Sequence, residues 1–349
     1  MPVSTASTGP TPSSQPSHFL SFPDLAARPA GGSVVWANDD LFAERENLIK
    51  PAPAEFRPAT FGHKGQIYDG WETRRRRGLG PAAFDSAIVR LGVPGIVRGV
   101  VVDTAWFTGN YPPQISVEGA HVAGYPPVDE LIEKCDWTTL VERSSVNGDT
   151  RNPFKVSSSS RWTHIRLSIY PDGGVARFRV HGEGLLDPKF AENMTLDLAA
   201  LENGGRITAC SNMFYSSPNN LLLPGTARTM GEGWETSRRR DSGNDWVQVH
   251  LASQGVLNAA EIDTSYFVGN APGKAKLSAR DGDGEWFELL PTTDLLPDTR
   301  HRFLIDSDRP VTDARLDIYP DGGMARLRLF GALTDAGLQT VRDKWDASA

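Results

Sequence analysis

The sequence predicts an all-β protein built from two tandem β-sandwich or jelly-roll domains that arose by internal duplication. Residues 70–77, which read Gly-Trp-Glu-Thr followed by four arginines, return as residues 233–240 with a single change. Short apolar runs bounded by glycine and proline recur along both halves, which is typical of buried strands joined by turns. Helical periodicity is scarce, so we expect a sandwich or jelly roll in each half.

The duplication extends well beyond that one motif. Matching segments occur in the same order in both halves, namely residues 24–27 and 197–200, 103–104 and 263–264, 109–110 and 269–270, and 169–174 and 318–323. Because the order never changes, we interpret the chain as two copies of one unit of about 150 to 170 residues, an ordinary size for a single domain.

The domain boundaries follow from where these matches begin and end. We place the first repeat at residues 19–183 and the second at residues 197–349, with a connector at residues 184–196. Residues 1–18 are rich in Ser, Thr, Pro and Gly and lack an apolar core of signal-peptide type, so we expect a disordered tail there.

Two apolar runs in each repeat predict short buried strands. In the first repeat these are Ala87–Leu91 and Gly99–Asp103, and in the second they are Val247–Leu251 and Glu261–Asp263. Ahead of them, 18 residues separate Pro51 from Gly70, whereas only 8 separate Pro224 from Gly233. We therefore expect a loop insertion that is present in the first copy alone.

A further element surrounds the sequence Pro-Asp-Gly-Gly at residues 171–174. Apolar and polar residues alternate on both sides of it, and the second copy repeats the pattern between Arg315 and Gly331. Proline favours the φ of a turn and glycine tolerates positive φ, so we predict a β-hairpin in each repeat. Short helices are expected only at Asp129–Cys135 and Thr334–Trp345.

Composition excludes several classes of protein. The 36 basic and 43 acidic residues leave a net charge of −7, which argues against nucleic acid or an anionic membrane as a main partner. Cys135 and Cys210 lie in different halves without CxxC spacing, which indicates a reducing compartment and no structural zinc. No apolar run of 18 residues occurs, so we expect no membrane span and a cytoplasmic location.

The repeated Gly-Trp-Glu-Thr motif offers a carboxylate beside fixed cations. Glu72 is followed by Arg74 and Arg75, and Glu235 is followed by Arg238. Arginine can grip a planar carboxylate through two hydrogen bonds, which suits the recognition of a small anion. The alternative is a solvated charged surface, and the presence of the motif in both halves favours a site.

Two aspartates end apolar strands and are also candidates. Asp103 and Asp263 are each followed by Thr, an aromatic residue and a Gly-Asn pair that contains Asn110 or Asn270. A carboxylate at a strand end can point into a cleft and act as an acid or base. It can equally bond to the following turn, and the residues alone leave both interpretations open.

Pairs of arginines follow the Pro-Asp-Gly-Gly turns. Arg177 and Arg179 alternate on one strand, and Arg326 and Arg328 are their counterparts, so one member of each pair is a candidate to contact a ligand anion. No nucleophile elbow, phosphate-binding loop, dinucleotide fingerprint or zinc-protease motif occurs.

Together these motifs resemble the allantoicase family. The similarity rests on the Gly-Trp-Glu-Thr motif in both copies, on the Asp-Thr and Gly-Asn segments, on Pro-Asp-Gly-Gly, and on residues 198–205 and 217–225, and it extends from about residue 19 to residue 345. The resemblance implies two jelly-roll domains of the galactose-binding-like type, usually assembled as homo-oligomers. It also implies hydrolysis of allantoate to ureidoglycolate and urea in purine catabolism.

Allantoate carries one carboxylate and two ureido groups on a single carbon, which gives the candidate residues separate roles. We expect Glu72, Asp103, Glu235 and Asp263 to supply acid or base catalysis, and Arg74, Arg75, Asn110, Arg177, Arg238, Asn270 and Arg326 to bind substrate. A carboxylic acid would protonate the leaving urea nitrogen and a carboxylate would activate water. This scheme requires no cofactor, and the sequence leaves open whether a divalent metal binds.

Two other functions stay in view. A tandem carbohydrate-binding module would share the sandwich fold but would release no urea, because the fold alone does not determine function. Nucleic-acid binding through residues 74–77 would require salt-dependent affinity, which the acidic balance of the chain disfavours.

Overall fold

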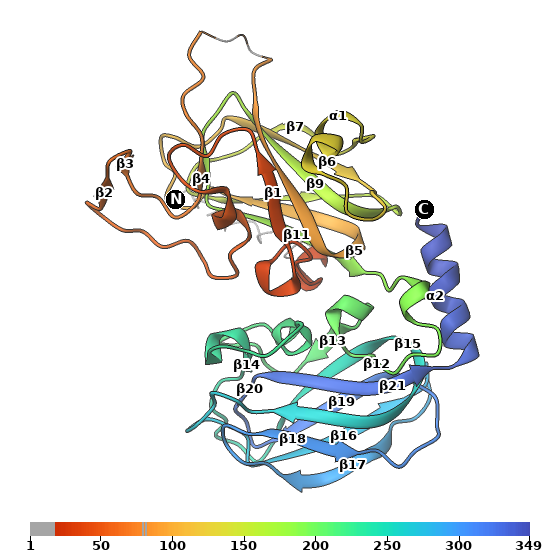
Figure 1. Ribbon diagram of the computed structural model, residues 1–349. Coiled ribbons are helices and arrows are strands. Elements are labelled where there is room, and N and C mark those ends of the chain that lie inside the picture. Colours follow the sequence, from red (N-terminus) through yellow and green to blue (C-terminus); the bar gives the residue numbers. More distant parts are fainter. Residues whose placement is uncertain (1–17, 79, 81) are drawn as a thin grey trace, which may run out of the picture.

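Two β-sandwiches follow one another along the chain, and the C-terminal helix lies beside both (Figure 1). The computed structural model describes residues 18–78, 80 and 82–349, so the predicted tail lies outside the described residues except for His18. Every strand pair within the described residues is antiparallel, and the same arrangement occurs in both halves. The predicted fold class, an all-β chain of two tandem jelly-roll sandwiches, is confirmed.

One long strand organises the first half. The strands of this half are β1 (Ser33–Ala37), β5 (Asp85–Asp103), β6 (Gln114–Ala120), β7 (Thr138–Ser145), β8 (Arg151–Lys155), β9 (Arg161–Tyr170) and β11 (Arg177–Gly184). The first part of β5 pairs with β1 and β9, and β6 and β7 extend that layer. The last part of β5 pairs with β8 and β11 to form the second layer.

The second half repeats this plan around β15. Its strands are β12 (Leu196–Asp197), β13 (Arg206–Cys210), β15 (Asp245–Asp263), β16 (Lys274–Arg280), β17 (Phe287–Asp294), β18 (Arg300–Leu304), β19 (Val311–Tyr319) and β21 (Arg326–Leu333). β13, β19, β16 and β17 form one layer with the start of β15, and β18, β21 and β12 form the other with its end.

The four predicted strand segments all lie in strands, but the two of each repeat belong to one strand, because β5 and β15 each run unbroken for 19 residues. The register against β9 shifts between Arg90 and Gly95, so the strand bends between the layers without ending. Gly95 allows the backbone of β11 to approach closely here, since a Cβ on it would lie 2.5 Å from the Glu183 carbonyl oxygen.

The predicted β-hairpins at Pro-Asp-Gly-Gly are wrong. β9 and β11 both pair with β5, the first with residues 85–96 and the second with residues 95–103, and not with each other. The turn therefore carries the chain from one layer to the other. Alternation with period two is common to strands in either layer, so it could not reveal which strands are partners.

Short elements complete the framework. Besides β12, the two-residue strands are β2 (Phe61–Gly62), β3 (Gly65–Gln66), β4 (Trp71–Glu72), β10 (Gly174–Val175), β14 (Trp234–Glu235) and β20 (Gly323–Met324). The 3₁₀ helices are η1 (His18–Ser21), η2 (Arg28–Ala30), η3 (Arg45–Ile49), η4 (Pro188–Phe190), η5 (Leu201–Asn203), η6 (Pro218–Leu222) and η7 (Met230–Glu232).

The two α-helices agree with the predicted positions. They are α1 (Val128–Glu133) and α2 (Asp335–Ala347). Thr334 caps α2 by accepting a hydrogen bond from the Gly337 amide, which satisfies a free N–H of the first turn. No helix of the described residues is long and apolar enough to cross a membrane.

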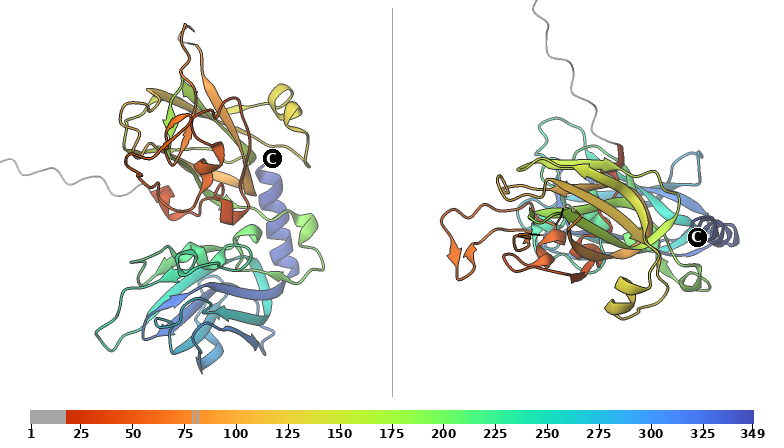
Figure 2. Two further views of the ribbon diagram at one scale, coloured as in Figure 1. Left: turned by 60° about the vertical axis from the view of Figure 1, so that its left-hand side comes forward. Right: turned by 90° about the horizontal axis from the view of Figure 1, so that it is seen from above.

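Helix α2 ties the second half back to the first (Figure 2). The Arg161 guanidinium of β9 lies 3.6 Å from the centre of the Trp345 ring and donates a 3.0 Å hydrogen bond to the Ser348 hydroxyl. A buried guanidinium is tolerated only where it is well partnered, so these contacts favour one fixed position of the helix.

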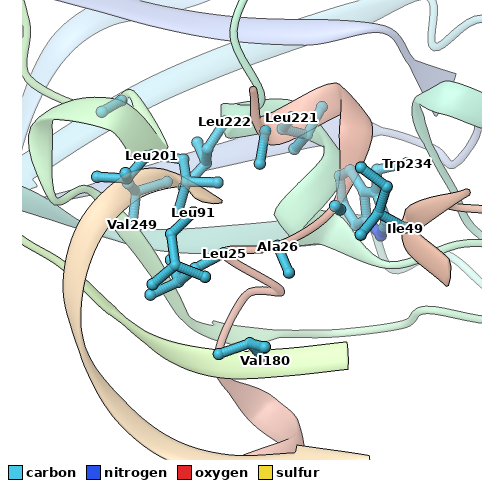
Figure 3. Packing of buried hydrophobic residues seen from close by; sticks show 14 of the residues in the cluster. Leu25, Ala26, Ile49, Leu91, Val180, Leu201, Leu221, Leu222, Trp234 and Val249 are labelled. Atoms are coloured by element: carbon cyan, nitrogen blue, oxygen red, sulfur yellow. The ribbon is translucent and has the colours of Figure 1, made fainter. Parts of the chain in front are cut away.

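A continuous apolar core joins the halves. Figure 3 shows Leu25 and Leu91 from the first half together with Leu201, Leu222 and Val249 from the second, and all five belong to one buried cluster. The backbones also approach closely here, because a Cβ on Gly184 would lie 2.8 Å from the Leu201 carbonyl oxygen. The boundaries placed at residues 184 and 197 remain a prediction.

Replacing Leu201 by Ala should destabilise the whole chain. Its side chain is 2% exposed in the shared core, and truncation of a buried leucine costs about 2 to 5 kcal/mol. We expect a single cooperative unfolding transition whose midpoint lies at a lower urea concentration than that of the wild type. Tryptophan fluorescence measures this midpoint. The control Leu304→Ala removes a side chain that is 89% exposed and should leave the midpoint unchanged. Equal midpoints for the two variants would contradict the shared core.

Candidate active site

The pairing of β4 with β10 brings two distant motifs together. Glu72 lies opposite Gly174, and Trp71 lies opposite Val175. The Thr73 amide donates to the Gly173 carbonyl oxygen at 3.1 Å, and the Gly173 amide donates to the Thr73 hydroxyl at 3.3 Å. The Gly-Trp-Glu-Thr motif and the Pro-Asp-Gly-Gly motif thus form one small ladder that holds Glu72 at a fixed place.

Asn110 adds a third motif to this ladder. Its side-chain Nδ2 donates to Glu72 Oε1 at 2.8 Å, and its carbonyl oxygen accepts from the Gly174 amide at 2.7 Å. The amide therefore positions the carboxylate and links it to the turn. The sequence predicted both residues as site members but gave no sign that they contact each other.

Buried aromatic residues lie beneath this arrangement. Trp71 is fully buried and donates from Nε1 to the Asp39 carbonyl oxygen at 2.7 Å. Phe107, also fully buried, lies so close that a Cβ on Gly174 would approach its ring to 2.0 Å. Only glycine fits at this position, which explains why the turn carries it in both copies.

A cavity of about 820 Å³ opens over Glu72. The residues around it come from the Gly-Trp-Glu-Thr-Arg segment, the Gly-Asn loop, the Pro-Asp-Gly-Gly turn and the insertion. The side chains that matter most for chemistry are Glu72, Arg75, Arg76, Arg77, Asn110, Tyr111 and Asp172, with Lys64, Gln66 and Tyr68 from the insertion.

The surroundings of Glu72 favour its protonated form. Burial raises the pKa of Glu72, and this effect outweighs the Asn110 hydrogen bond and the positive charge of Arg75, which oppose it. A carboxyl group with a raised pKa that lines a cavity is suited to general acid catalysis.

Two of the four arginines bind framework carboxylates, and one of these two, Arg76, also lines the cavity. Arg74 forms an ion pair with the buried carboxylate of Asp39 and does not line the cavity. Arg76 donates from Nε to the buried Asp85 at 2.8 Å. Arg75, predicted to bind substrate, is exposed and lines the cavity.

Asp103 and Arg177 do not line this cavity. Asp103 Oδ1 accepts from the Ala105 amide at 2.9 Å, which is the turn-bonding alternative. Arg177 is 1% exposed and donates to the Ala52 and Asp69 carbonyl oxygens at 2.9 Å each. The structure thus separates these two from Glu72, Arg75 and Asn110.

The second half repeats the same contacts around Glu235. Asn270 Nδ2 donates to Glu235 Oε1 at 2.7 Å, and Glu235 pairs with Gly323. Arg238 is exposed beside them. Asp263, 1% exposed, accepts from the Ser265 amide at 2.8 Å, as its counterpart does. Arg326 donates to the Glu232 carbonyl oxygen at 2.7 Å.

The halves nevertheless differ at two points. Ser237 replaces Arg74 and bonds to Asn212 at 2.7 Å, so a neutral pair replaces the Arg74–Asp39 ion pair. The segment between Pro224 and Gly233 is ten residues shorter than its counterpart between Pro51 and Gly70. The side of the first-half cavity that Lys64 and Tyr68 line therefore has no equivalent in this shorter segment. The unequal loop lengths were the one sequence signal that pointed to these missed residues.

No group of three or more His, Cys, Asp or Glu side chains suited to a metal ion occurs in the part of the chain that the structure describes. His63, in the insertion, is exposed. His164 is buried, and burial with the nearby positive charge of Arg90 lowers its pKa to about 4. It bonds to Thr163 at 2.9 Å and belongs to the framework of β9.

A half-buried glutamate, a partnered amide and an arginine around one cavity, carried by a duplicated sandwich, are suited to bind a small polar anion and to transfer a proton to it. A family model described as the allantoicase repeat matches residues 23–185 and 196–334. A probable allantoicase of Nocardia farcinica is 58% identical over 319 residues, which cover 91% of this chain and 96% of that protein. The allantoicase of Dictyostelium discoideum is 38% identical over 327 residues, covering 90% and 88%.

The crystal structure of allantoicase from Saccharomyces cerevisiae agrees with these relatives. It matches with a TM-score of 0.77 at 33% identity and covers 88% of this chain and 92% of its own. The chain belongs to the allantoicase family.

Replacement of Asp103 by Ala should reduce stability and spare the chemistry. The variant loses the hydrogen bond to the Ala105 amide, a loss worth about 1 kcal/mol. We expect a lower midpoint of urea denaturation, with little change in the turnover of allantoate measured by urea release. A folded variant without turnover would place Asp103 in the catalytic machinery after all.

Proposed function

We propose that this chain hydrolyses allantoate to ureidoglycolate and urea in the cavity over Glu72. Membership of the allantoicase family supports the reaction, and the geometry around Glu72 supports the place. The observation on which the proposal rests is the half-buried Glu72 carboxyl, held by Asn110 at 2.8 Å beside the exposed Arg75.

The substrate fits the charges of this cavity. Allantoate has one carboxylate, which the planar guanidinium of Arg75 can bind through two hydrogen bonds. Its ureido groups present N–H donors and carbonyl acceptors to the polar lining, such as Gln66 and Tyr111. A site of this kind orients the central carbon of allantoate with respect to Glu72. Correct orientation of the substrate toward the reacting side chain is a main source of rate acceleration.

The reaction proceeds in two steps. Glu72 gives its proton to one ureido nitrogen while the bond from that nitrogen to the central carbon breaks. The lone pair of the other ureido nitrogen forms a C=N bond, and neutral urea leaves. The Glu72 carboxylate then accepts a proton from water as the water oxygen bonds to the central carbon. The C=N electron pair returns to nitrogen, which yields ureidoglycolate and restores protonated Glu72.

The wider cellular setting is part of the proposal. We propose a cytoplasmic homo-oligomer, since the family resemblance implies assembly and the composition favours a reducing compartment. Light scattering of the purified chain measures the assembly directly, and a monomer at working concentration would contradict it.

Glu72→Gln tests the role of the carboxyl group. Gln keeps the acceptor for Asn110 but cannot give or take a proton, so we expect urea release to fall by about 10² to 10⁴. Glu285→Gln, an exposed change away from the cavity, is the control. The matching variant Glu235→Gln tests the second half in the same way. We expect a smaller loss of urea release from Glu235→Gln than from Glu72→Gln. Wild-type turnover by Glu72→Gln would contradict the mechanism.

The raised pKa of Glu72 also predicts an effect of pH. The protonated carboxyl is favoured in the folded chain, so its contribution to stability is complete below its ordinary pKa of 4.5 and is lost as pH rises through the raised value. Glu72→Gln should therefore gain stability relative to the wild type at pH 7 but not at pH 4. Thermal unfolding at the two pH values measures this difference, and kcat of the wild type should fall as Glu72 ionises.

A further inference from the structure

The buried guanidinium of Arg177 fastens both ends of the insertion. We name residues 52–69 the insertion loop. Near its start, Arg177 donates to the Ala52 and Pro53 carbonyl oxygens at 2.9 and 3.2 Å. At its end, Arg177 donates to the Asp69 carbonyl oxygen at 2.9 Å and to the Asp69 carboxylate at 2.6 Å. One side chain therefore closes the loop at its base.

The base of the loop is further fixed by Asp69. Its carboxylate accepts from the Glu55 amide at 3.0 Å and forms an ion pair with Lys50 at 3.3 Å. Because Arg177 is 1% exposed, its positive charge is stabilised by these acceptors and not by water. The guanidinium could reach solvent only if its hydrogen bonds to the loop were broken. The loop ends are thus held by a charge-assisted network.

This fixed base leads directly into the cavity. Tyr68, next to Asp69, stacks on the buried Phe107 with ring centres 5.0 Å apart. Phe107 also packs against Gly174, the partner of Glu72. Tyr68, Gln66 and Lys64 line the same cavity as Glu72, so the position of the loop determines the shape of that wall.

The second half retains the clamp but has no comparable wall. Arg326 donates to the Gly225 carbonyl oxygen at 3.2 Å and to the Glu232 carbonyl oxygen at 2.7 Å. These acceptors bound a segment of only 8 residues between Pro224 and Gly233, against 18 in the first half. The same anchoring side chain therefore holds a longer loop in the first half, where the cavity contains Glu72. The shorter segment carries the cation Arg228, which is paired with Glu232 at 2.8 Å.

The loop supplies a charge that the substrate can use. Lys64 is exposed, lines the cavity and forms no ion pair in the described part of the chain. Arg75, from the Gly-Trp-Glu-Thr-Arg segment, lines the same cavity. An ammonium and a guanidinium on two walls can bind the same carboxylate, and only the guanidinium belongs to a motif found in both copies.

We propose that the insertion loop is the specificity element of the first-half site, in which Lys64 completes with Arg75 the grip on the substrate carboxylate and Arg177 acts as a positioning residue that holds the wall in place. This inference rests on the proposed function. It also assigns the carboxylate preference to the first half, since the second has no counterpart of Lys64.

Kinetics of the full chain test the positioning role. Arg177→Lys keeps the positive charge but lacks the planar fork that reaches both ends of the loop. We expect KM for allantoate to rise about tenfold with kcat largely kept, because binding and not proton transfer is weakened. The matched Arg326→Lys variant loses the same kind of clamp in the other half, and we expect the smaller change in KM. Equal effects of the two variants would overturn the proposal.

Lys64→Gln tests the specificity role without risk to folding, since the side chain is exposed. The probe is hydantoate, which has one ureido arm and a carboxylate but no second urea to release, compared by calorimetry with its neutral amide. We expect the wild type to prefer the carboxylate about tenfold, Lys64→Gln to reduce this preference because only Arg75 then binds the carboxylate, and Lys64→Arg to restore it. Lys155→Gln, an exposed lysine outside the cavity, should keep it.

The two levels of inference fail separately. A wild-type chain that releases no urea from allantoate would contradict the proposed function, whatever the loop does. A chain that releases urea while Lys64→Gln keeps its carboxylate preference would overturn the role of the loop and leave the reaction intact.

Discussion

The site depends on one short antiparallel pairing, that of Trp71–Glu72 with Gly174–Val175. Each of its members has little freedom. Trp71 is fully buried, and Gly174 has no room for a Cβ because the Phe107 ring lies directly against it. Asn110 then bonds to both strands, through its side chain to Glu72 and through its carbonyl oxygen to Gly174. The Glu72 carboxyl is thus held by backbone pairing and by closely packed, buried aromatic rings.

Duplication explains why this pairing occurs twice and why the two copies are not equivalent. The framework residues, such as the Trp, Thr and Asn of the motifs, make the same contacts in both halves. What differs is the loop between the proline and the motif and the pair Arg74–Asp39, replaced by Ser237–Asn212. The contacts that the two halves share therefore preserve the scaffold, while the differences in the loop and in the pair Arg74–Asp39 alter the charge and shape around each glutamate.

Several arginines illustrate how context decides the role of a residue. Arg177 and Arg326 each alternate with a second arginine on their own strand, which suggested contact with an anion. Each is buried and donates to backbone carbonyl oxygens instead. Arg75 and Lys64 are exposed at the cavity. Burial of a guanidinium demands fixed acceptors, so a buried arginine serves the framework unless a ligand supplies them.

The sequence by itself determined the duplication and the all-β class and named Glu72, Arg75 and Asn110 as site candidates, because repeated motifs and apolar patterns are local properties of the chain. It did not determine that β9 and β11 lie in different layers, that Asp103 bonds to its own turn, or that the insertion loop forms a wall of the cavity. These features arise from contacts between residues far apart in sequence, and period two is the same for any partner. Only the packing of the two layers selects among those partners.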